Sequence, residues 1–149
     1  MRPKDKDIRI IEQLNEDGRL SLREIAKNLD YSPSTISNHF HRLKENKVIK
    51  GFKPDLDYEK LGFSFTCITQ ITTEAGEQKK VAKTLSDRSY IHSLYQVTGD
   101  TDVIAICKFR SREKMRKNLT EDINQLKGIT GTKTNVALDS IVEGRPIDL

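Results

Sequence analysis

The sequence predicts an α+β protein: an N-terminal three-helix winged helix-turn-helix domain followed by a βαββαβ ferredoxin-like domain. Two observations indicate the first domain. A turn of about three residues joins two short amphipathic helical patterns, and a basic, strand-like run at residues 48–53 follows them as a wing. A third observation indicates the second domain: from Phe63 onward, strand and helix patterns follow one another in the order β, α, β, β, α, β.

Capping residues place the three N-terminal helices. Ser21 and Ser32 precede the two short patterns as N-caps, and Pro33 occupies a first-turn position, where its missing N–H costs little. Asp5 is placed to cap an earlier helix. Helices are therefore expected at residues 5–17, 21–29 and 32–45. The apolar residues of these helices and of the following strand predict one core: Ile8, Ile11, Leu14, Leu22, Ile25, Leu29, Ile36, Phe40, Leu43, Val48 and Ile49.

The outer face of the helix at 32–45 predicts contact with nucleic acid. Its start is uncharged and rich in hydroxyl groups, whereas a solvated helix would more often carry Glu and Lys. Short donors and acceptors of this kind suit base edges and phosphates. Any helical hairpin with a polar outer face shares the pattern, so the rest of the chain has to support the assignment. The predicted DNA contacts are Ser32, Ser34, Thr35, Ser37, Asn38, His39, His41, Arg42 and Lys50.

The positive charge of the chain is confined to its N-terminal third. The net charge is +4. Residues 1–53 hold 12 Lys and Arg against 8 Asp and Glu, whereas residues 54–149 hold 14 of each. A basic patch on a neutral body is the electrostatic footprint of a DNA contact, and it is also seen on ordinary solvated faces. The charge distribution therefore supports the helix-turn-helix assignment but does not establish it by itself.

Other function classes find no support in the sequence. No apolar stretch reaches the length of a membrane span and the charged start is unlike a secretory signal, so we expect a cytoplasmic protein. Cys67 and Cys107 lack the spacing of a metal or redox site and are interpreted as small buried residues, with a bridge between strands as the alternative. Three histidines make no metal motif, and phosphate-loop and nucleophile motifs are missing. We therefore predict no enzyme, no cofactor and no metal site.

The C-terminal part is expected to form one sheet with two helices on one side. Residues 54–62 are acidic and turn-rich, and they separate a domain at 1–53 from one at 63–149. The strand at 103–109 is apolar on both faces, and no further helix remains to cover the second face. A second copy of the domain is the natural cover, which predicts a homodimer whose two helix-turn-helix units reach two DNA half-sites. The other strands are expected at residues 63–71, 91–98 and 130–142, and the helices at 74–86 and 112–126.

The chain resembles the Lrp/AsnC family of transcriptional regulators over nearly its whole length. The resemblance rests on several pieces in one order: Asp17-Gly18-Arg19, Leu22-Arg23-Glu24-Ile25-Ala26, Ser32-Pro33-Ser34-Thr35-Ile36, Val48-Ile49-Lys50-Gly51-Phe52 and Val97-Thr98-Gly99-Asp100-Thr101-Asp102. It implies homodimers that assemble into tetramers or octamers on double-stranded DNA. It also implies a C-terminal domain, called RAM, that binds a small effector, typically an amino acid, between subunits.

The loop at 99–102 is the expected effector site. Gly99 lets the backbone approach a ligand closely, and Asp100 or Asp102 suits the ammonium group of an amino acid. An ordinary Gly-Asp turn would contain the same residues. The resemblance favours the site and adds two threonines, so the expected effector contacts are Gly99, Asp100, Thr101, Asp102, Thr132 and Thr134.

One residue departs from the family pattern. Where members often have Arg in the middle of the recognition helix, this chain has His39, and a neutral imidazole contacts phosphate or guanine more weakly than a guanidinium does. His39 and His41 are alternatively plain surface residues. The predicted function is a sequence-specific DNA-binding transcriptional regulator modulated by a small effector. The alternative is an architectural DNA-compacting protein without an effector response, which would share every N-terminal feature.

Overall fold

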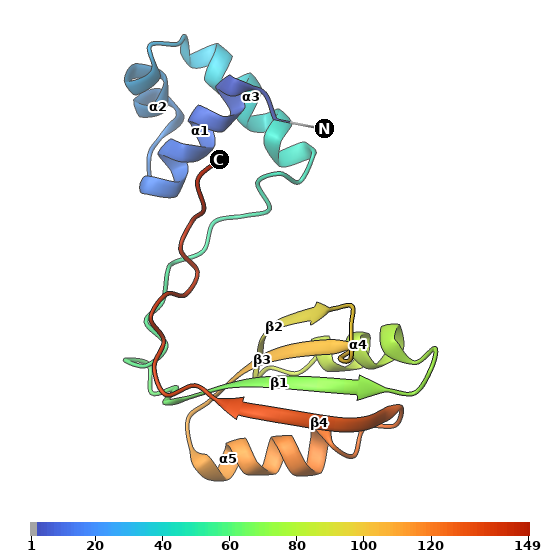
Figure 1. The fold of residues 1–149 in the computed structure, drawn as a ribbon. Helices are drawn as coiled ribbons and strands as arrows, with labels where there is room; N and C mark the ends of the chain where they lie inside the picture. Colours follow the sequence, from blue (N-terminus) through green and yellow to red (C-terminus); the bar gives the residue numbers. More distant parts are fainter. Residues whose placement is uncertain (1–2) are drawn as a thin grey trace. The chain divides into compact units, whose positions relative to one another are not determined.

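The computed structural model describes residues 3–149, and the chain divides into two compact units (Figure 1). One unit runs through Asp55 and includes the tail Val142–Leu149, and the other is Leu56–Ile141. The sequence analysis instead places the tail in the second domain. Each unit has its own hydrophobic core. No helix within residues 3–149 is long and apolar enough to cross a bilayer.

The first unit contains three helices: α1 (Asp5–Glu16), α2 (Leu22–Leu29) and α3 (Pro33–Glu45). Ser21 caps α2 by accepting a hydrogen bond from the backbone N–H of Glu24 at 3.2 Å. Ser32 caps α3 in the same way, accepting from Thr35 N at 3.1 Å. Both predicted caps are confirmed, but the prediction for α1 was wrong. Lys4 is its N-cap, because the Asp7 carboxylate accepts from the Lys4 backbone N–H at 2.8 Å and so starts the helix one residue earlier.

The core of the first unit differs from the predicted one in α1, in α3 and in the segment after α3. Ile10 is fully buried with Ile25, Ile36 and Leu43, whereas Ile8 lies outside this cluster. Three isoleucines within four positions leave the buried face of α1 undecided in the sequence, and packing against α2 and α3 selects it. Two further predicted core residues, Phe40 and Val48, also lie outside the cluster. The Phe40 ring stacks on the exposed ring of Phe52, with 6.3 Å between the ring centroids, and Val48 is exposed.

The predicted wing strand at residues 48–53 is not present. The chain turns at Lys47, which has a φ of 56°, and the backbone N–H groups of Val48 and Ile49 both donate to the carbonyl of Leu43 at the end of α3. The residues that follow are irregular up to Asp57. A strand needs a neighbouring strand to satisfy its backbone, and this segment pairs with no strand among the described residues.

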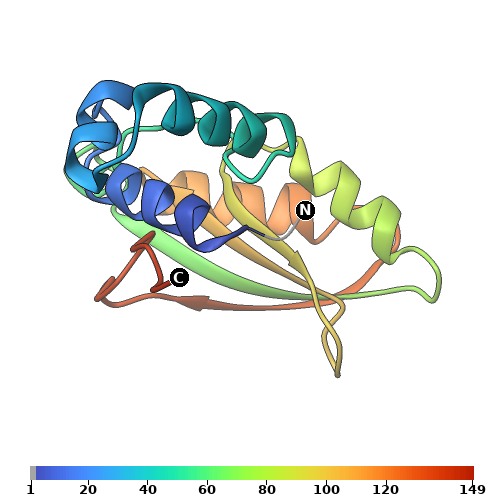
Figure 2. The same cartoon turned by 90° about the horizontal axis from the view of Figure 1, so that it is seen from above.

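The second unit is an antiparallel four-stranded sheet in the order β2-β3-β1-β4, with its helices on one side (Figure 2). The predicted βαββαβ order is confirmed. The elements are β1 (Phe65–Thr73), α4 (Gln78–Ser86), β2 (Ile91–Gln96), β3 (Val103–Phe109), α5 (Arg112–Lys117), the π-helical segment η1 (Asn118–Ile123) and β4 (Ile129–Val136).

The last strand and the two helices of this unit are shorter than predicted. β4 ends at Val136, not at residue 142, because its neighbour β1 pairs only as far as Cys67 opposite Val136, with one more bond from Ala137 N to Thr66 O. Leu138 beyond it is fully exposed. α4 starts at residue 78, not 74, and the predicted helix at 112–126 is α5 followed by η1, which ends at Ile123.

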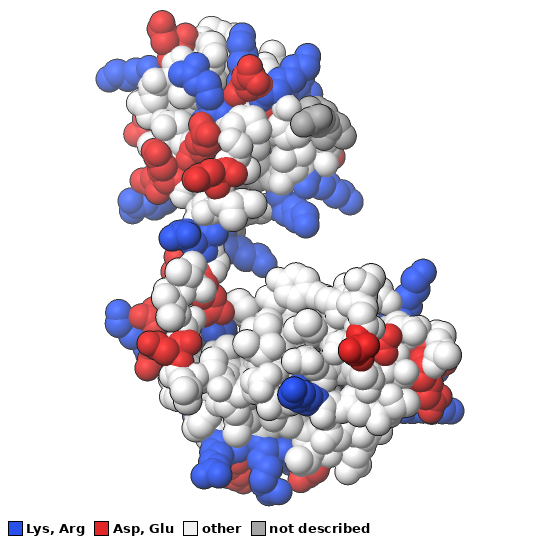
Figure 3. Space-filling model, in the orientation of Figure 1, with Lys and Arg blue, Asp and Glu red and all other residues white. Residues whose placement is uncertain are grey.

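The two faces of the sheet differ in burial. The face under the helices is closed by Ile71, Val103 and Cys107 packed against Leu85 and Ile123, all fully buried. On the opposite face the ring of Tyr58 lies against Lys108, and no helix or strand of the described part of this unit covers the rest. This face presents apolar and uncharged side chains around one exposed lysine, and Figure 3 shows few charged side chains over much of the second unit. The residues of this open face include Ile68, Gln70, Ser93, Tyr95, Ile104, Ile106, Lys133 and Asn135.

Candidate DNA-contacting surface and effector loop

The outer face of α3 carries the short polar side chains that the sequence analysis singles out. Ser34, Asn38 and His41 are exposed, and Thr35 and Ser37 are half-buried beside them. At the start of the helix, the Ser32 hydroxyl lies 3.0 Å from Ser34 Oγ and 2.8 Å from Thr35 Oγ1. These hydroxyls therefore form one hydrogen-bonded group at the positive end of the helix dipole.

Two predicted DNA contacts, His39 and Arg42, also contact Asp7 of α1. His39 Nδ1 lies 2.7 Å from Asp7 Oδ1, and Arg42 Nη2 donates to both carboxylate oxygens of Asp7 at 2.8 Å. The Asp7 side chain is fully buried, whereas 37% of the Arg42 side chain remains exposed. Both residues therefore fix α3 against α1, and their contact with DNA stays a prediction.

Asp7 is a structural residue that the sequence analysis missed. Burial alone would raise the pKa of its carboxyl, but hydrogen bonds from Lys4 N, His39 and Arg42 outweigh burial and lower the pKa below its ordinary value. A signal was present in the sequence. Asp7, Ile10, Ile11 and Leu14 share the i, i+3, i+4, i+7 spacing of one buried face, and a carboxylate on such a face requires cationic partners.

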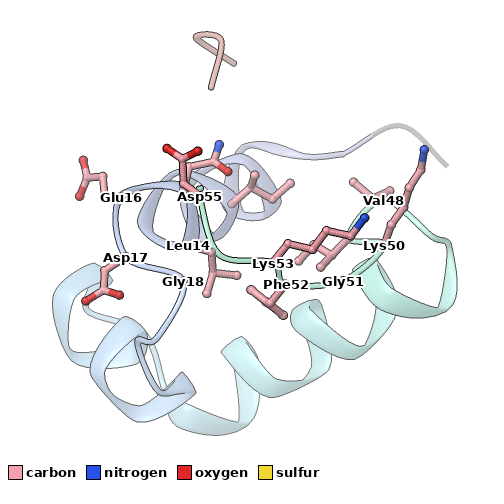
Figure 4. Close-up of a pocket in the computed structure, with 13 residues that line it drawn as sticks. Leu14, Glu16, Asp17, Gly18, Val48, Lys50, Gly51, Phe52, Lys53 and Asp55 are labelled. Atoms are coloured by element: carbon pink, nitrogen blue, oxygen red, sulfur yellow. The ribbon is translucent and has the colours of Figure 1, made fainter. Parts of the chain in front are cut away.

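The segment after α3 lines a groove of about 560 Å³ against the end of α1, drawn in Figure 4. Apolar side chains such as Leu14 and Phe52 form part of its wall. Figure 4 shows Lys50 and Lys53 toward one end and acidic side chains, including Asp17, toward the other. Lys50, a predicted DNA contact, is exposed at the rim of this groove.

The predicted effector loop joins β2 to β3, and its two aspartates differ in role. The Asp102 carboxylate accepts from Thr73 N at 2.7 Å and from Thr73 Oγ1 at 3.0 Å, and the backbone hydrogen bond is the main cause of its lowered pKa. Asp102 therefore ties the loop to the end of β1. Asp100 is exposed, and Gly99 has a φ of 109° with open space where a Cβ would lie. The Thr101 hydroxyl lies 3.4 Å from Gln70 Oε1.

The two threonines added by the resemblance lie on β4 and already have partners. Thr134 Oγ1 is 3.0 Å from the buried Thr69 Oγ1, and Thr132 Oγ1 donates to Asn124 Oδ1 at 2.5 Å. Thr132 is opposite Ile71, whose carbonyl accepts from Asp102 N at 3.0 Å. Backbone pairing thus connects the loop to Thr132, while the hydroxyl of Thr134 lies under the helices.

Neither cysteine forms a reactive or metal-binding site. Cys67 and Cys107 are opposed on β1 and β3 as buried free thiols, and burial raises the pKa of Cys107 to about 12. Within residues 3–149, no group of three or more His, Cys, Asp and Glu side chains is arranged to hold a metal ion.

Comparison with known proteins identifies both parts of the chain. A family model described as the Lrp/AsnC ligand binding domain matches residues 66–147, and one described as a winged helix-turn-helix DNA-binding domain matches residues 4–50. An uncharacterised HTH-type transcriptional regulator of Pyrococcus furiosus is 38% identical over 139 residues, 93% of each chain. A second one, from Pyrococcus abyssi, is 34% identical over 137 residues, 92% of each chain.

Solved structures agree on the fold. E. coli AsnC superposes with a TM-score of 0.91 over the whole of both chains at 23% identity. A transcriptional regulator from Neisseria meningitidis, solved as a complex with L-Met, has a TM-score of 0.85 at 18% identity and covers 95% of this chain and 94% of its own. With its DNA-binding helix-turn-helix and its Lrp/AsnC ligand-binding domain, the chain belongs to the Lrp/AsnC family of transcriptional regulators.

Proposed function

We propose that this protein recognises specific DNA sites through α3 and regulates transcription in response to a small amino-acid effector. The observation that carries the proposal is the polar face of α3, on which Ser34, Asn38 and His41 are exposed, as side chains that contact base edges have to be. The names of its relatives support a protein that acts by binding and not by catalysis.

The first test is selection of bound fragments from sheared genomic DNA, at one near-physiological salt concentration, with and without a pool of amino acids. Salt is held constant because phosphate contacts alone give strong, sequence-independent affinity. Enrichment of a short palindrome that changes with the pool is the expected result. Uniform recovery of all fragments, unaffected by the pool, would refute the proposal and favour the architectural compactor.

A point variant tests the recognition face directly. Asn38→Ala removes an exposed amide of the kind that pairs with adenine, and we expect it to cost about 1–3 kcal/mol of discrimination against mismatched sites. Gln125→Ala, which removes an exposed amide from the second unit, is the matched control and should leave discrimination unchanged. Equal discrimination by the two variants would exclude Asn38 from base reading.

We propose further that two copies pair through the open face of the sheet. Ile68 is 38% exposed and Tyr95 56% exposed on a face that bears one exposed charged side chain, Lys133. Burying such a face against a second copy removes apolar area from water. Ile68→Glu is expected to yield monomers in sedimentation velocity. Ser86→Glu, on the helix-covered side, should sediment as wild type. A stable Ile68→Glu dimer would contradict this interface.

The effector is proposed to bind at the loop between β2 and β3. The family description of the domain and the L-Met complex of the Neisseria protein support a ligand for this domain, and the exposed Asp100 supports its place at the loop. Asp100 has the role of accepting from the ammonium group, because the Asp102 carboxylate is already bonded to Thr73. In calorimetric titrations with single L-amino acids, Asp100→Ala should lose binding and keep its effector-free DNA affinity. Wild-type ligand binding by Asp100→Ala would exclude the site.

A further inference from the structure

A second basic surface lies on α1, outside the helix-turn-helix pair. Lys6 Nζ is 4.8 Å from the centroid of the Tyr31 ring, and the Arg9 guanidinium carbon is 5.7 Å from it. Arg9 Nη1 also donates to Tyr31 Oη at 3.2 Å. Residues three apart on a helix share a face, so two cations converge on one aromatic ring.

The charges of this group are not neutralised within the described residues. Neither Lys6 nor Arg9 makes an ion pair there. Asp7 follows Lys6 in α1, but its carboxylate already accepts from Lys4, His39 and Arg42. Two like charges around one ring repel each other, and an anion between them would relieve the repulsion. The tyrosine holds both side chains in place and keeps its own O–H free to donate, because its oxygen accepts from Arg9.

The position of the group relative to α3 suggests which anion it binds. Tyr31 directly precedes Ser32, the N-cap of α3, so the group that it forms with α1 adjoins the start of that helix in the chain. Asp7 braces α1 against α3 through His39 and Arg42, so the two cations are held at a fixed distance from the exposed face of α3. A helix in the major groove has the sugar-phosphate backbones along its sides, which places phosphates within reach.

We propose that Lys6, Arg9 and Tyr31 form a phosphate clamp that holds the DNA backbone at the edge of the groove entered by α3. The proposal rests on the proposed function and adds α1 to the DNA-contacting surface. The ring pre-orders the two cations, which lowers the entropy lost when a phosphate binds. Because phosphate contacts carry no sequence information, the clamp contributes affinity and orientation and leaves base preference to α3.

The test measures DNA affinity against salt concentration for the full-length protein on a short duplex that carries a selected fragment. Replacing both cations, Lys6→Gln with Arg9→Gln, keeps helix-forming side chains and removes two charges. The clamp holds one phosphate, and each lost phosphate contact should reduce the slope of log K against log salt by about 0.9, so the double variant should lose about 0.9, with at least a tenfold loss of affinity. Its preference for the selected fragment over a scrambled one should persist.

The matched control is Lys79→Gln with Lys83→Gln, which removes two exposed charges from α4 and should keep the wild-type slope. Tyr31→Phe retains the ring and loses the O–H. We expect a two- to threefold loss of DNA affinity, which corresponds to the contribution of one weak hydrogen bond. A wild-type slope in the folded Lys6→Gln/Arg9→Gln variant, checked by circular dichroism, would overturn the clamp. Failure of the proposed function has a different signature, because wild-type protein would then prefer no fragment over scrambled DNA.

Discussion

Removing the buried carboxylate of Asp7 should destabilise the N-terminal unit more than any exposed charge change in α1. Asp7→Ala leaves Lys4 N at the helix start without its acceptor, and the loss of such a cap costs about 1 kcal/mol. It also removes charge-assisted hydrogen bonds from His39 and Arg42, of order 1.5–3 kcal/mol each before correction.

The free energy assigned to the Arg42 hydrogen bonds has to be reduced, because the Arg42 side chain is partly exposed. Its side chain is 37% exposed and regains water contacts when Asp7 is lost, so the lower end of that range applies. With the cap and the two hydrogen bonds taken at the lower end, we therefore expect a loss of about 4 kcal/mol in the free energy of unfolding. For a unit of this size the melting temperature should fall by roughly 16–32 °C.

The assay is urea unfolding of the full chain followed by far-UV circular dichroism, in which the three helices of the first unit contribute strongly. Asp5→Ala is the control, because Asp5 lies in the same first turn of α1 and is exposed. It should lose no more than about 1 kcal/mol, the scale of a helix-dipole interaction. If Asp7→Ala and Asp5→Ala unfolded within about 0.5 kcal/mol of each other, the proposed brace between α1 and α3 would be refuted.

Three further outcomes are expected. The lowered pKa of Asp7 means that its stabilisation is complete above about pH 4 and is lost as pH falls through its folded-state pKa, so acid titration of stability should be steeper for wild type than for Asp7→Ala. Gly128→Ala should cost about 1–3 kcal/mol in thermal unfolding, because Gly128 has a φ of 93° and a Cβ there would lie 3.2 Å from Val81 Cγ2; a wild-type melting temperature would contradict this. Cys67 and Cys107 should resist alkylation in the native protein at about pH 8 and react only on unfolding, as followed by intact mass; fast native labelling would show that the thiols are accessible.

Local signals in the sequence predicted most of the fold. Hydroxyl caps at Ser21 and Ser32 act within three residues of themselves, so the starts of α2 and α3 were predictable. The alternation in β1 likewise indicates which side chains face the helices. Strand ends were less predictable, because β4 stops where its neighbour β1 stops pairing, and that register is a property of two strands distant in sequence.

The candidate site likewise combines features that the local sequence predicts with features that depend on distant residues. The hydroxyl-rich face of α3 could be identified from spacing alone, since exposure follows from the apolar stripe on the opposite side. The roles of His39 and Arg42 could not, because they depend on a carboxylate more than 30 positions earlier in the chain. Asp102 is a similar case, since its partner Thr73 comes from another strand.

By itself, then, the sequence determined the two-part α+β architecture, the polar helix face and the loop between β2 and β3, because each depends on residues close together in the chain. Only the tertiary structure decided which of these polar groups remain available to a partner. Asp7 engages His39 and Arg42, Thr73 engages Asp102, and the ring of Tyr31 draws Lys6 and Arg9 together. Each of these contacts forms when helices or strands pack, so it joins residues far apart in the chain. The Asp7 and Asp102 carboxylates are satisfied by packing and are not free acceptors at the surface, whereas the packing of Tyr31 leaves two cations without an acidic partner in the described part of the chain.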